Sequence, residues 1–182
     1  LPRSIDKGLS DTHFGWPTRA TIGLGLLCFL ALMAEGSVLD WSAIYFTAEF
    51  KVDAGTAGLG YAFFSGGMAA SRFTGDWLRQ KFGAVPMVVA SALLTAVSIA
   101  LAVSVSSFVT AVVAFTFAGI GIGNIAPVLF AGGGRLEPDA PGRGIAAVTT
   151  LGYAGFLAGP PLIGFAAEVT SLGHAFWLVV LS

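Results

Sequence analysis

The sequence has few charged residues. Lys and Arg number nine and Asp and Glu ten among 182 residues, which makes 10% of the chain, against about 25% in a typical soluble domain. The formal net charge of −1 excludes a protein that binds nucleic acid through an overall positive charge. A single cysteine, Cys28, excludes an internal disulfide. We therefore expect neither a basic nucleic-acid-binding domain nor a disulfide-rich secreted domain.

Long uncharged runs separate the scarce charges, and 55% of the residues are hydrophobic. No Asp, Glu, Lys or Arg occurs in 20–34, 54–71, 82–134, 144–167 or 169–182. A helix that crosses a bilayer needs about 20 apolar residues, so 82–134 is long enough for two helices, with a polar turn at SVSS, 104–107. The glycines lie inside these runs, as is typical of membrane helices that pack closely. The sequence predicts an all-α membrane protein.

The runs predict six transmembrane helices, at about 20–47, 55–76, 83–104, 107–132, 143–169 and 172–182. The last helix is truncated, because its residues span only about 16 Å at 1.5 Å per residue. The chain begins with Leu1 rather than Met and carries no signal-peptide pattern. We expect a fragment of a longer protein, in which 1–19 precedes a transmembrane domain that covers 20–182.

The basic residues predict an orientation in the membrane. All of them except Lys51 fall in the N-terminal segment or in two connections on the same side: Arg3, Lys7, Arg19, Arg72, Arg79, Lys81, Arg135 and Arg143. Cytoplasmic loops of membrane proteins carry an excess of Lys and Arg. We expect the N-terminal segment in the cytoplasm, Lys51 on the outside and the chain in the cell inner membrane.

One short stretch occurs twice. Residues 59–67 read LGYAFFSGG and 151–159 read LGYAGFLAG. The first copy lies in the second predicted helix and the second in the fifth, so the two copies cross the membrane in opposite directions. This arrangement is typical of the three-plus-three inverted repeat of secondary transporters, although a chain rich in Leu, Gly and Ala can also repeat by chance. The repeat predicts that Tyr61 and Tyr153 occupy equivalent positions.

Three stretches resemble the major facilitator superfamily (MFS). GDWLRQKFG, 75–83, resembles the cytoplasmic loop motif of this family, and its matching residues are Gly75, Asp76, Arg79, Lys81 and Gly83. It departs from the family pattern in spacing by one residue, and Ala84-Val85 replaces the usual basic pair. GFLAGPPLIG, 155–164, resembles the glycine–proline helix motif of the family. AEGSVLDWS, 34–42, resembles a branch of MosC-like bacterial permeases.

The resemblance covers essentially the whole chain and implies the C-terminal six-helix half of an MFS transporter. Residues 1–19 would then be the end of the central cytoplasmic loop. The partners that it implies are the lipid bilayer, the N-terminal half of the same transporter and a small-molecule substrate. We expect secondary transport by alternating access. The alternative is a membrane sensor or assembly subunit that has the same fold and transports nothing.

Two carboxylates fall inside the first hydrophobic region, Glu35 and Asp40. A charged side chain at membrane depth costs free energy and normally faces a cavity or a partner. On a straight helix the two positions are about 140° apart, so both can face one cavity only if the helix breaks, for which Gly36-Ser37 is suited. We expect Glu35 to be the proton carrier and Asp40 a second candidate. The alternatives are an interhelical hydrogen bond for Glu35 and a solvated position near the outer surface for Asp40.

Helical faces predict a substrate cavity. In the fifth helix Gly152, Gly155 and Gly159 share a face suited to helix packing, which leaves Thr149 and Tyr153 free to meet substrate. Tyr61 is the counterpart of Tyr153 in the repeat. The one asparagine, Asn124, lies in GIGIGNIAP, 119–127, where a proline kink can free backbone carbonyls for a cavity. The alternative for each aromatic residue is packing against lipid or another helix.

Enzymatic activity, metals and cofactors are not expected. The glycine pattern GIGIG has no strand–turn–helix context, which argues against nucleotide binding. His13 and His174 fall on opposite sides of the membrane and cannot share a metal ion. Asp40 and Asp76 lie at different depths, so they cannot form the pair of an intramembrane aspartyl protease. No catalytic triad can be assembled from the remaining residues.

The predicted orientation can be tested with single cysteines. Lys51→Cys and Lys81→Cys, each in a Cys28→Ser background, would be treated in intact cells with a membrane-impermeant thiol reagent. We expect labelling at 51 and none at 81, because the basic residues place 72–82 in the cytoplasm. Labelling at 81 and not at 51 would reverse the orientation.

Overall fold

The structure is a computed structural model that describes residues 16–182, and its regular structure is entirely helical over that range. The elements are α1 (Arg19–Phe50), α2 (Ala54–Phe82), α3 (Ala84–Ser104), α4 (Phe108–Ile122), α5 (Ile125–Leu136), α6 (Pro141–Val169), α7 (Leu172–Ala175) and α8 (Trp177–Leu181). Most of the 1–19 segment, including Arg3, Lys7 and His13, lies outside the described residues. The fold class predicted from the sequence, an all-α membrane protein, is confirmed.

The six predicted helical segments all occur, but two are interrupted. The fourth is divided into α4 and α5 by a turn at Gly123–Asn124, and the sixth into α7 and α8 at Phe176. Four stretches of the described chain are long and apolar enough to cross a membrane, namely α1, α3, 108–136 and α6. The helix α2 has 29 residues but is not among these four, and its membrane crossing stays a prediction, as does that of the short α7–α8 segment.

The predicted end of the second helix, at about residue 76, is wrong. The helix α2 continues to Phe82, so Gly75, Asp76, Arg79 and Lys81 are helical, and Gly83 alone forms the turn to α3. Gly83 has φ of 87°, a conformation in which glycine has no steric cost. Basic residues in the last turn suit the negative end of the helix dipole, and Trp, Leu, Arg, Gln and Lys all tolerate a helix.

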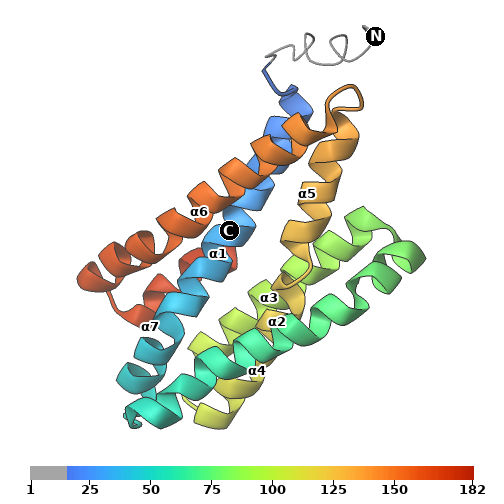
Figure 1. The fold of residues 1–182 in the computed structure, drawn as a ribbon. Helices are drawn as coiled ribbons and strands as arrows, with labels where there is room; N and C mark the ends of the chain where they lie inside the picture. The colour runs from blue at the N-terminus through green and yellow to red at the C-terminus, as the bar shows by residue number, and fades with distance from the viewer. Residues whose placement is uncertain (1–15) are drawn as a thin grey trace, which may run out of the picture.

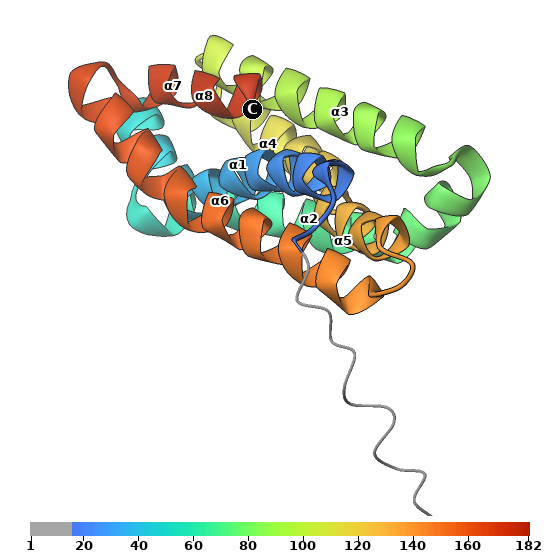
Figure 2. The ribbon, with the colours of Figure 1, turned by 90° about the horizontal axis from the view of Figure 1, so that it is seen from above.

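The long helices form a bundle in which α1 is central (Figure 1). Figure 2 shows α6 along one side of α1, with α3, α7 and α8 along the other. The helix α2 packs mainly on α4, and α3 packs on α4 from the opposite side. The buried core follows these contacts and includes Phe46, Phe64, Phe115 and Phe176. At one end of the bundle, Tyr45 donates a hydrogen bond to the Ala102 carbonyl oxygen at 3.0 Å.

Close approach of α1 and α6 depends on glycine, as predicted for the face that carries Gly152, Gly155 and Gly159. A Cβ atom on Gly155 would overlap the carbonyl oxygen of Phe29, and one on Gly159 would overlap that of Met33. Trp41 also joins the two helices, since its Nε1 donates to the Pro160 carbonyl oxygen at 2.8 Å. The packing of α1 on α6 therefore brings the two backbones within reach of each other.

A buried carboxylate, Glu137, ties the start of α1 to the α5–α6 connection. Its Oε1 accepts hydrogen bonds from the Thr18 backbone N–H at 2.7 Å and the Thr21 hydroxyl at 3.0 Å. Its Oε2 accepts from Arg143 Nη2 at 2.7 Å. The backbone N–H of Thr18, the Arg143 guanidinium and the Thr21 hydroxyl together lower the pKa of Glu137 to about 2. We call Thr18, Thr21, Glu137 and Arg143 the Glu137 clamp.

Replacing Gly155 with alanine tests the α1–α6 contact. We expect Gly155→Ala to destabilise the protein by roughly 1–3 kcal/mol, because the added methyl meets backbone that cannot give way. The matched control is Gly66→Ala on α2, where no atom lies within 4 Å of the added Cβ, and where higher helix propensity predicts an unchanged or slightly higher stability. Thermal unfolding in detergent measures both, and equal midpoints for the two variants would contradict the packing argument.

The Glu137 clamp predicts a specific pH dependence. A carboxyl group with a lowered pKa in the folded state adds stability above its ordinary pKa of 4.5, and this contribution is lost as the pH falls from there towards 2. We expect Glu137→Gln to lower the unfolding midpoint by several degrees at pH 7, with a difference from the wild type that shrinks below pH 4.5. Glu168→Gln, at an exposed position near the end of α6, is the control. A difference that stays constant between pH 7 and pH 3 would exclude this role of the ionised carboxylate.

Candidate functional site

Three charged residues lie away from the ends of the described helices: Glu35 and Asp40 on α1, and Arg72 on α2. Glu35 is about 24 Å along α1 from Arg19, at 1.5 Å per residue, which is near the middle of the helix. Arg72 is about 15 Å from the Phe82 end of α2 by the same measure. A charge at such a depth is typical of a functional position.

Glu35 and Arg72 face each other across α1 and α2. Arg72 Nη2 lies 4.0 Å from Glu35 Oε1, and the two side chains are 54% and 11% exposed. The distribution of basic residues predicted that Arg72 lies in a cytoplasmic connection, and no basic partner was predicted for Glu35. Arg72 instead lies within α2, well before its end at Phe82, and its guanidinium faces the buried carboxylate. The spacing along one helix could not reveal a partner on another.

The expected break in α1 at Gly36-Ser37 does not occur. The helix α1 runs unbroken from Arg19 to Phe50. Gly36 instead permits close contact with α6, where the Phe156 carbonyl oxygen would lie 2.7 Å from an added Cβ. The Ser37 hydroxyl donates to the Met33 carbonyl oxygen at 2.7 Å within the helix. On this unbroken helix Glu35 is buried and Asp40 is exposed, so the two carboxylates occupy different faces.

The interruption between α4 and α5 gives Arg72 its anchor. In a continuous helix the Gly123 carbonyl would accept from the backbone N–H four residues later, but that residue is Pro127, which has none. Arg72 Nε donates to this carbonyl at 3.2 Å instead. Arg72 Nη2 also lies 3.2 Å from the Met68 sulfur. Pro127 therefore leaves the Gly123 carbonyl without its helical donor, and the Arg72 guanidinium donates to it.

Asn124 also connects the α4–α5 turn to α2. Its side chain is buried, and Nδ2 donates to the Ser71 carbonyl oxygen at 2.8 Å. Gly75 leaves room for it, because a Cβ there would overlap Asn124 Oδ1. We name Glu35, Ser71, Arg72, Gly123 and Asn124 the Arg72 cluster. The cluster joins α1, α2 and the α4–α5 turn through polar contacts.

The other predicted substrate residues lie apart from these contacts. Tyr61 is 48% exposed on α2 and Tyr153 is 55% exposed on α6, where its ring centroid lies 6.5 Å from that of Phe130. Thr149 is half-buried on α6. Within residues 16–182 no hydrogen bond, ion pair or ring contact joins Tyr61, Thr149 or Tyr153 to the Arg72 cluster, and their role in a cavity stays a prediction.

The residues of the predicted loop motif make contacts near the end of α2. Arg79 Nη2 lies 3.2 Å from Asp76 Oδ1, three residues earlier on the same helix. Lys81 Nζ lies 4.8 Å from the centroid of the Trp77 ring, as in a cation–π contact. These contacts are local to α2, and a gating role for the motif stays a prediction.

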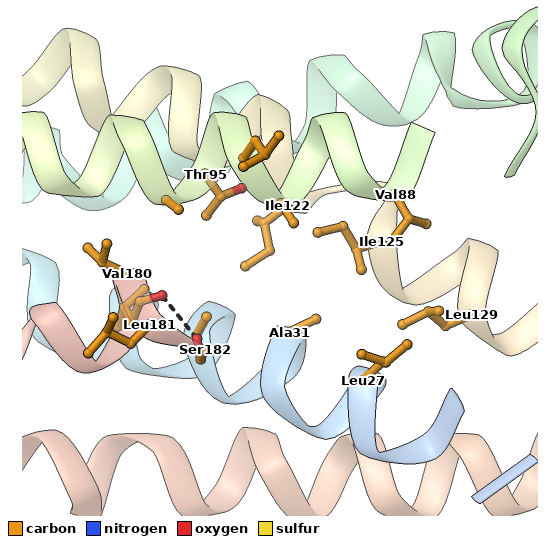
Figure 3. A pocket seen from close by; sticks show the side chains of 15 residues that line it. Leu27, Ala31, Val88, Thr95, Ile122, Ile125, Leu129, Val180, Leu181 and Ser182 are labelled. Carbon is orange, nitrogen blue, oxygen red and sulfur yellow. Dashed lines mark hydrogen bonds between the residues drawn. The ribbon is translucent and has the colours of Figure 1, made fainter. Parts of the chain in front are cut away.

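Two apolar hollows lie in the bundle, and neither is lined by the Arg72 cluster. One, of about 300 Å³, is lined by residues of α1, α3, α4, α5 and α8 (Figure 3). Its walls include Leu27, Ala31, Val88, Ile122 and Leu129, with the Thr95 hydroxyl as one of its few polar groups. None of the Arg72 cluster lines it. Within residues 16–182 no group of three or more His, Cys, Asp and Glu side chains could hold a metal ion.

Long apolar helices and a charged pair between two of them define a polytopic helical membrane protein. The family model of the Major Facilitator Superfamily matches residues 13–182. The chain belongs to this superfamily, as the loop and glycine–proline motifs indicated.

Relatives of the chain include two membrane proteins that are at least 30% identical to it over the aligned residues. It is 36% identical to an uncharacterised MFS-type transporter of Yersinia pestis over 98% of this chain and 48% of the relative. It is 30% identical to the membrane protein MosC of Rhizobium meliloti over 86% of this chain and 38% of the relative, which confirms the predicted resemblance. The chain thus spans about half the length, or less, of these relatives. No solved structure matches it significantly.

Proposed function

We propose that this chain is the C-terminal six-helix half of a secondary active transporter. It would work by alternating access with an N-terminal half of the same transporter, moving a small solute across the inner membrane with its N-terminal segment in the cytoplasm. Membership of the superfamily supports this proposal, and so does the match to about half the length of the relatives. In this proposal α1–α3 and α4–α8 are the two units of an inverted repeat, with Tyr61 and Tyr153 as counterparts.

The Glu35–Arg72 pair carries the proposal that transport is coupled to protons. An ionised Glu35 attracts the guanidinium at 4.0 Å across the α1–α2 contact. Protonation removes that attraction and leaves a neutral carboxyl group, which moves through apolar surroundings at a lower cost than a carboxylate. The proton on Glu35 therefore changes how firmly α1 and α2 are held together.

A change in the α1–α2 contact is suited to alternating access. The Arg72 anchor on Gly123 also connects α2 to the α4–α5 turn, so a shift at Arg72 acts on three elements at once. In an MFS half of this kind, a rocking motion requires contacts that exist in one state and not in the other. The Glu35–Arg72 pair is such a contact in our proposal, with Asp40 as a second proton-accepting candidate nearer the end of α1.

Glu35→Gln tests the proposal, because the amide mimics the protonated carboxyl group. In proteoliposomes that contain the full-length transporter, we expect this variant to lose solute accumulation driven by a pH gradient. Exchange of solute down its own gradient should remain, because neither half has lost its cavity. Uptake of candidate solutes would be measured at two external pH values, together with a pH-sensitive dye inside the vesicles.

Asp40→Asn is the matched control, since it also removes one carboxylate from α1 but at an exposed position. We expect this variant to lose less pH-driven accumulation than Glu35→Gln, because Asp40 lies at an exposed position nearer the end of α1. Full pH-driven accumulation by Glu35→Gln would exclude Glu35 as the proton carrier. Loss of both accumulation and exchange in that variant would point to a structural role for the carboxylate instead.

A further inference from the structure

Arg72 has binding capacity that its contacts do not use. A guanidinium has five N–H donors in a planar fork. Nε donates to the Gly123 carbonyl and Nη2 is near the Met68 sulfur, while the structure gives Nη1 no partner within residues 16–182. The side chain is 54% exposed in this chain. A fixed, half-exposed fork of this kind is suited to a planar anion.

The Arg72–Glu35 pair lacks the short hydrogen bond that the Arg143–Glu137 pair of the same protein has. Arg143 Nη2 lies 2.7 Å from Glu137 Oε2, which is the distance of a charge-assisted hydrogen bond. Arg72 Nη2 lies 4.0 Å from Glu35 Oε1, which is too long for a hydrogen bond. Glu35 thus neutralises Arg72 through space without occupying its donors. Another carboxylate that reaches the fork could form the hydrogen bonds that Glu35 does not.

We propose that Arg72 is the recognition site for the carboxylate of a small organic acid, and that Glu35 is its internal competitor. This inference rests on the proposed transport function and names the substrate class. Arg72 is the one basic residue away from the ends of the described helices, so a singly charged carboxylate balances it. A phosphate dianion would need a second cation at the same depth.

Charge balance then predicts how many protons are taken up with each bound carboxylate. With Glu35 ionised, the pair is neutral, and an incoming carboxylate would leave one uncompensated negative charge among the helices. Binding therefore favours uptake of one proton by Glu35. The other charged residues of the helices packed around it lie nearer the helix ends: Asp76, Arg79 and Lys81 on α2, Arg135 on α5, and Arg143 and Glu168 on α6. On α1 itself the nearest titratable side chains along the sequence are Asp40, which is exposed, and Cys28. Carboxylate and proton would travel together, without net charge.

Binding to the purified full-length transporter in detergent tests the inference without measuring transport. The probes are sodium acetate, lactate and benzoate, each compared with its own amide, and inorganic phosphate. We expect at least one carboxylate, and not its amide or phosphate, to raise the unfolding midpoint. In weak buffer its binding should take up about one proton per site, and its affinity should fall about tenfold per pH unit once Glu35 is ionised.

Four variants separate the roles of the two residues. Arg72→Gln should weaken carboxylate binding at least about tenfold, and Arg72→Lys should retain part of it because the charge remains without the fork. Glu35→Gln should bind more tightly and without proton uptake, because the competitor has gone. The double variant Glu35→Gln/Arg72→Gln leaves no unpaired charge, so it should fold even where Arg72→Gln alone does not, and it should bind no carboxylate.

Three results would overturn the inference. They are the absence of any shift with the carboxylates, equal binding of acid and amide, and carboxylate binding that survives in the double variant. The proposed transport function fails separately, through the accumulation measurements on Glu35→Gln. Carboxylate binding that depends on Arg72 in a protein without pH-driven accumulation would retain the recognition site and remove proton-coupled transport.

Discussion

One missing backbone hydrogen bond organises the centre of this bundle. Pro127 has no N–H to give to the Gly123 carbonyl, and an unpaired carbonyl inside a membrane protein costs several kcal/mol. Arg72 supplies the donor from α2, and Asn124, the next residue of the turn, donates back to the α2 backbone at Ser71. The α4–α5 turn and α2 therefore each donate a side-chain hydrogen bond to the backbone of the other. The hydrogen bond to Gly123 holds the Arg72 guanidinium inside the bundle, where it faces Glu35.

Two acid–base pairs in the same chain show how geometry separates a structural role from a proposed functional one. Glu137 accepts three hydrogen bonds from two neighbouring segments and has a pKa of about 2, so it stays ionised and holds α1 to the α5–α6 connection. Glu35 has one basic neighbour at 4.0 Å. A pair without a hydrogen bond can be exchanged for another partner at little cost, which is what a transport cycle requires of a contact that forms and breaks.

Glycines permit two kinds of close contact in this bundle. Between α1 and α6 the faces at Gly36, Gly155 and Gly159 let backbones meet, and these contacts are apolar or involve carbonyl oxygens. Near the Arg72 cluster, Gly75 makes space for the Asn124 side chain. The first kind of contact was predictable, because Gly152, Gly155 and Gly159 repeat at helical spacing within one segment. The second was not, since it depends on which residue of another helix lies opposite.

The sequence by itself determined the helical membrane class, the places of the helices and the superfamily, because hydrophobic run lengths and local motifs are properties of contiguous residues. It also singled out Glu35 from its depth. The unbroken course of α1 through Gly36-Ser37 and the partner of Glu35 were decided only by tertiary structure. The pairing of Arg72 with Glu35 depends on a contact between helices. No spacing along one segment specifies which residues of two helices face each other, because that depends on how the helices pack.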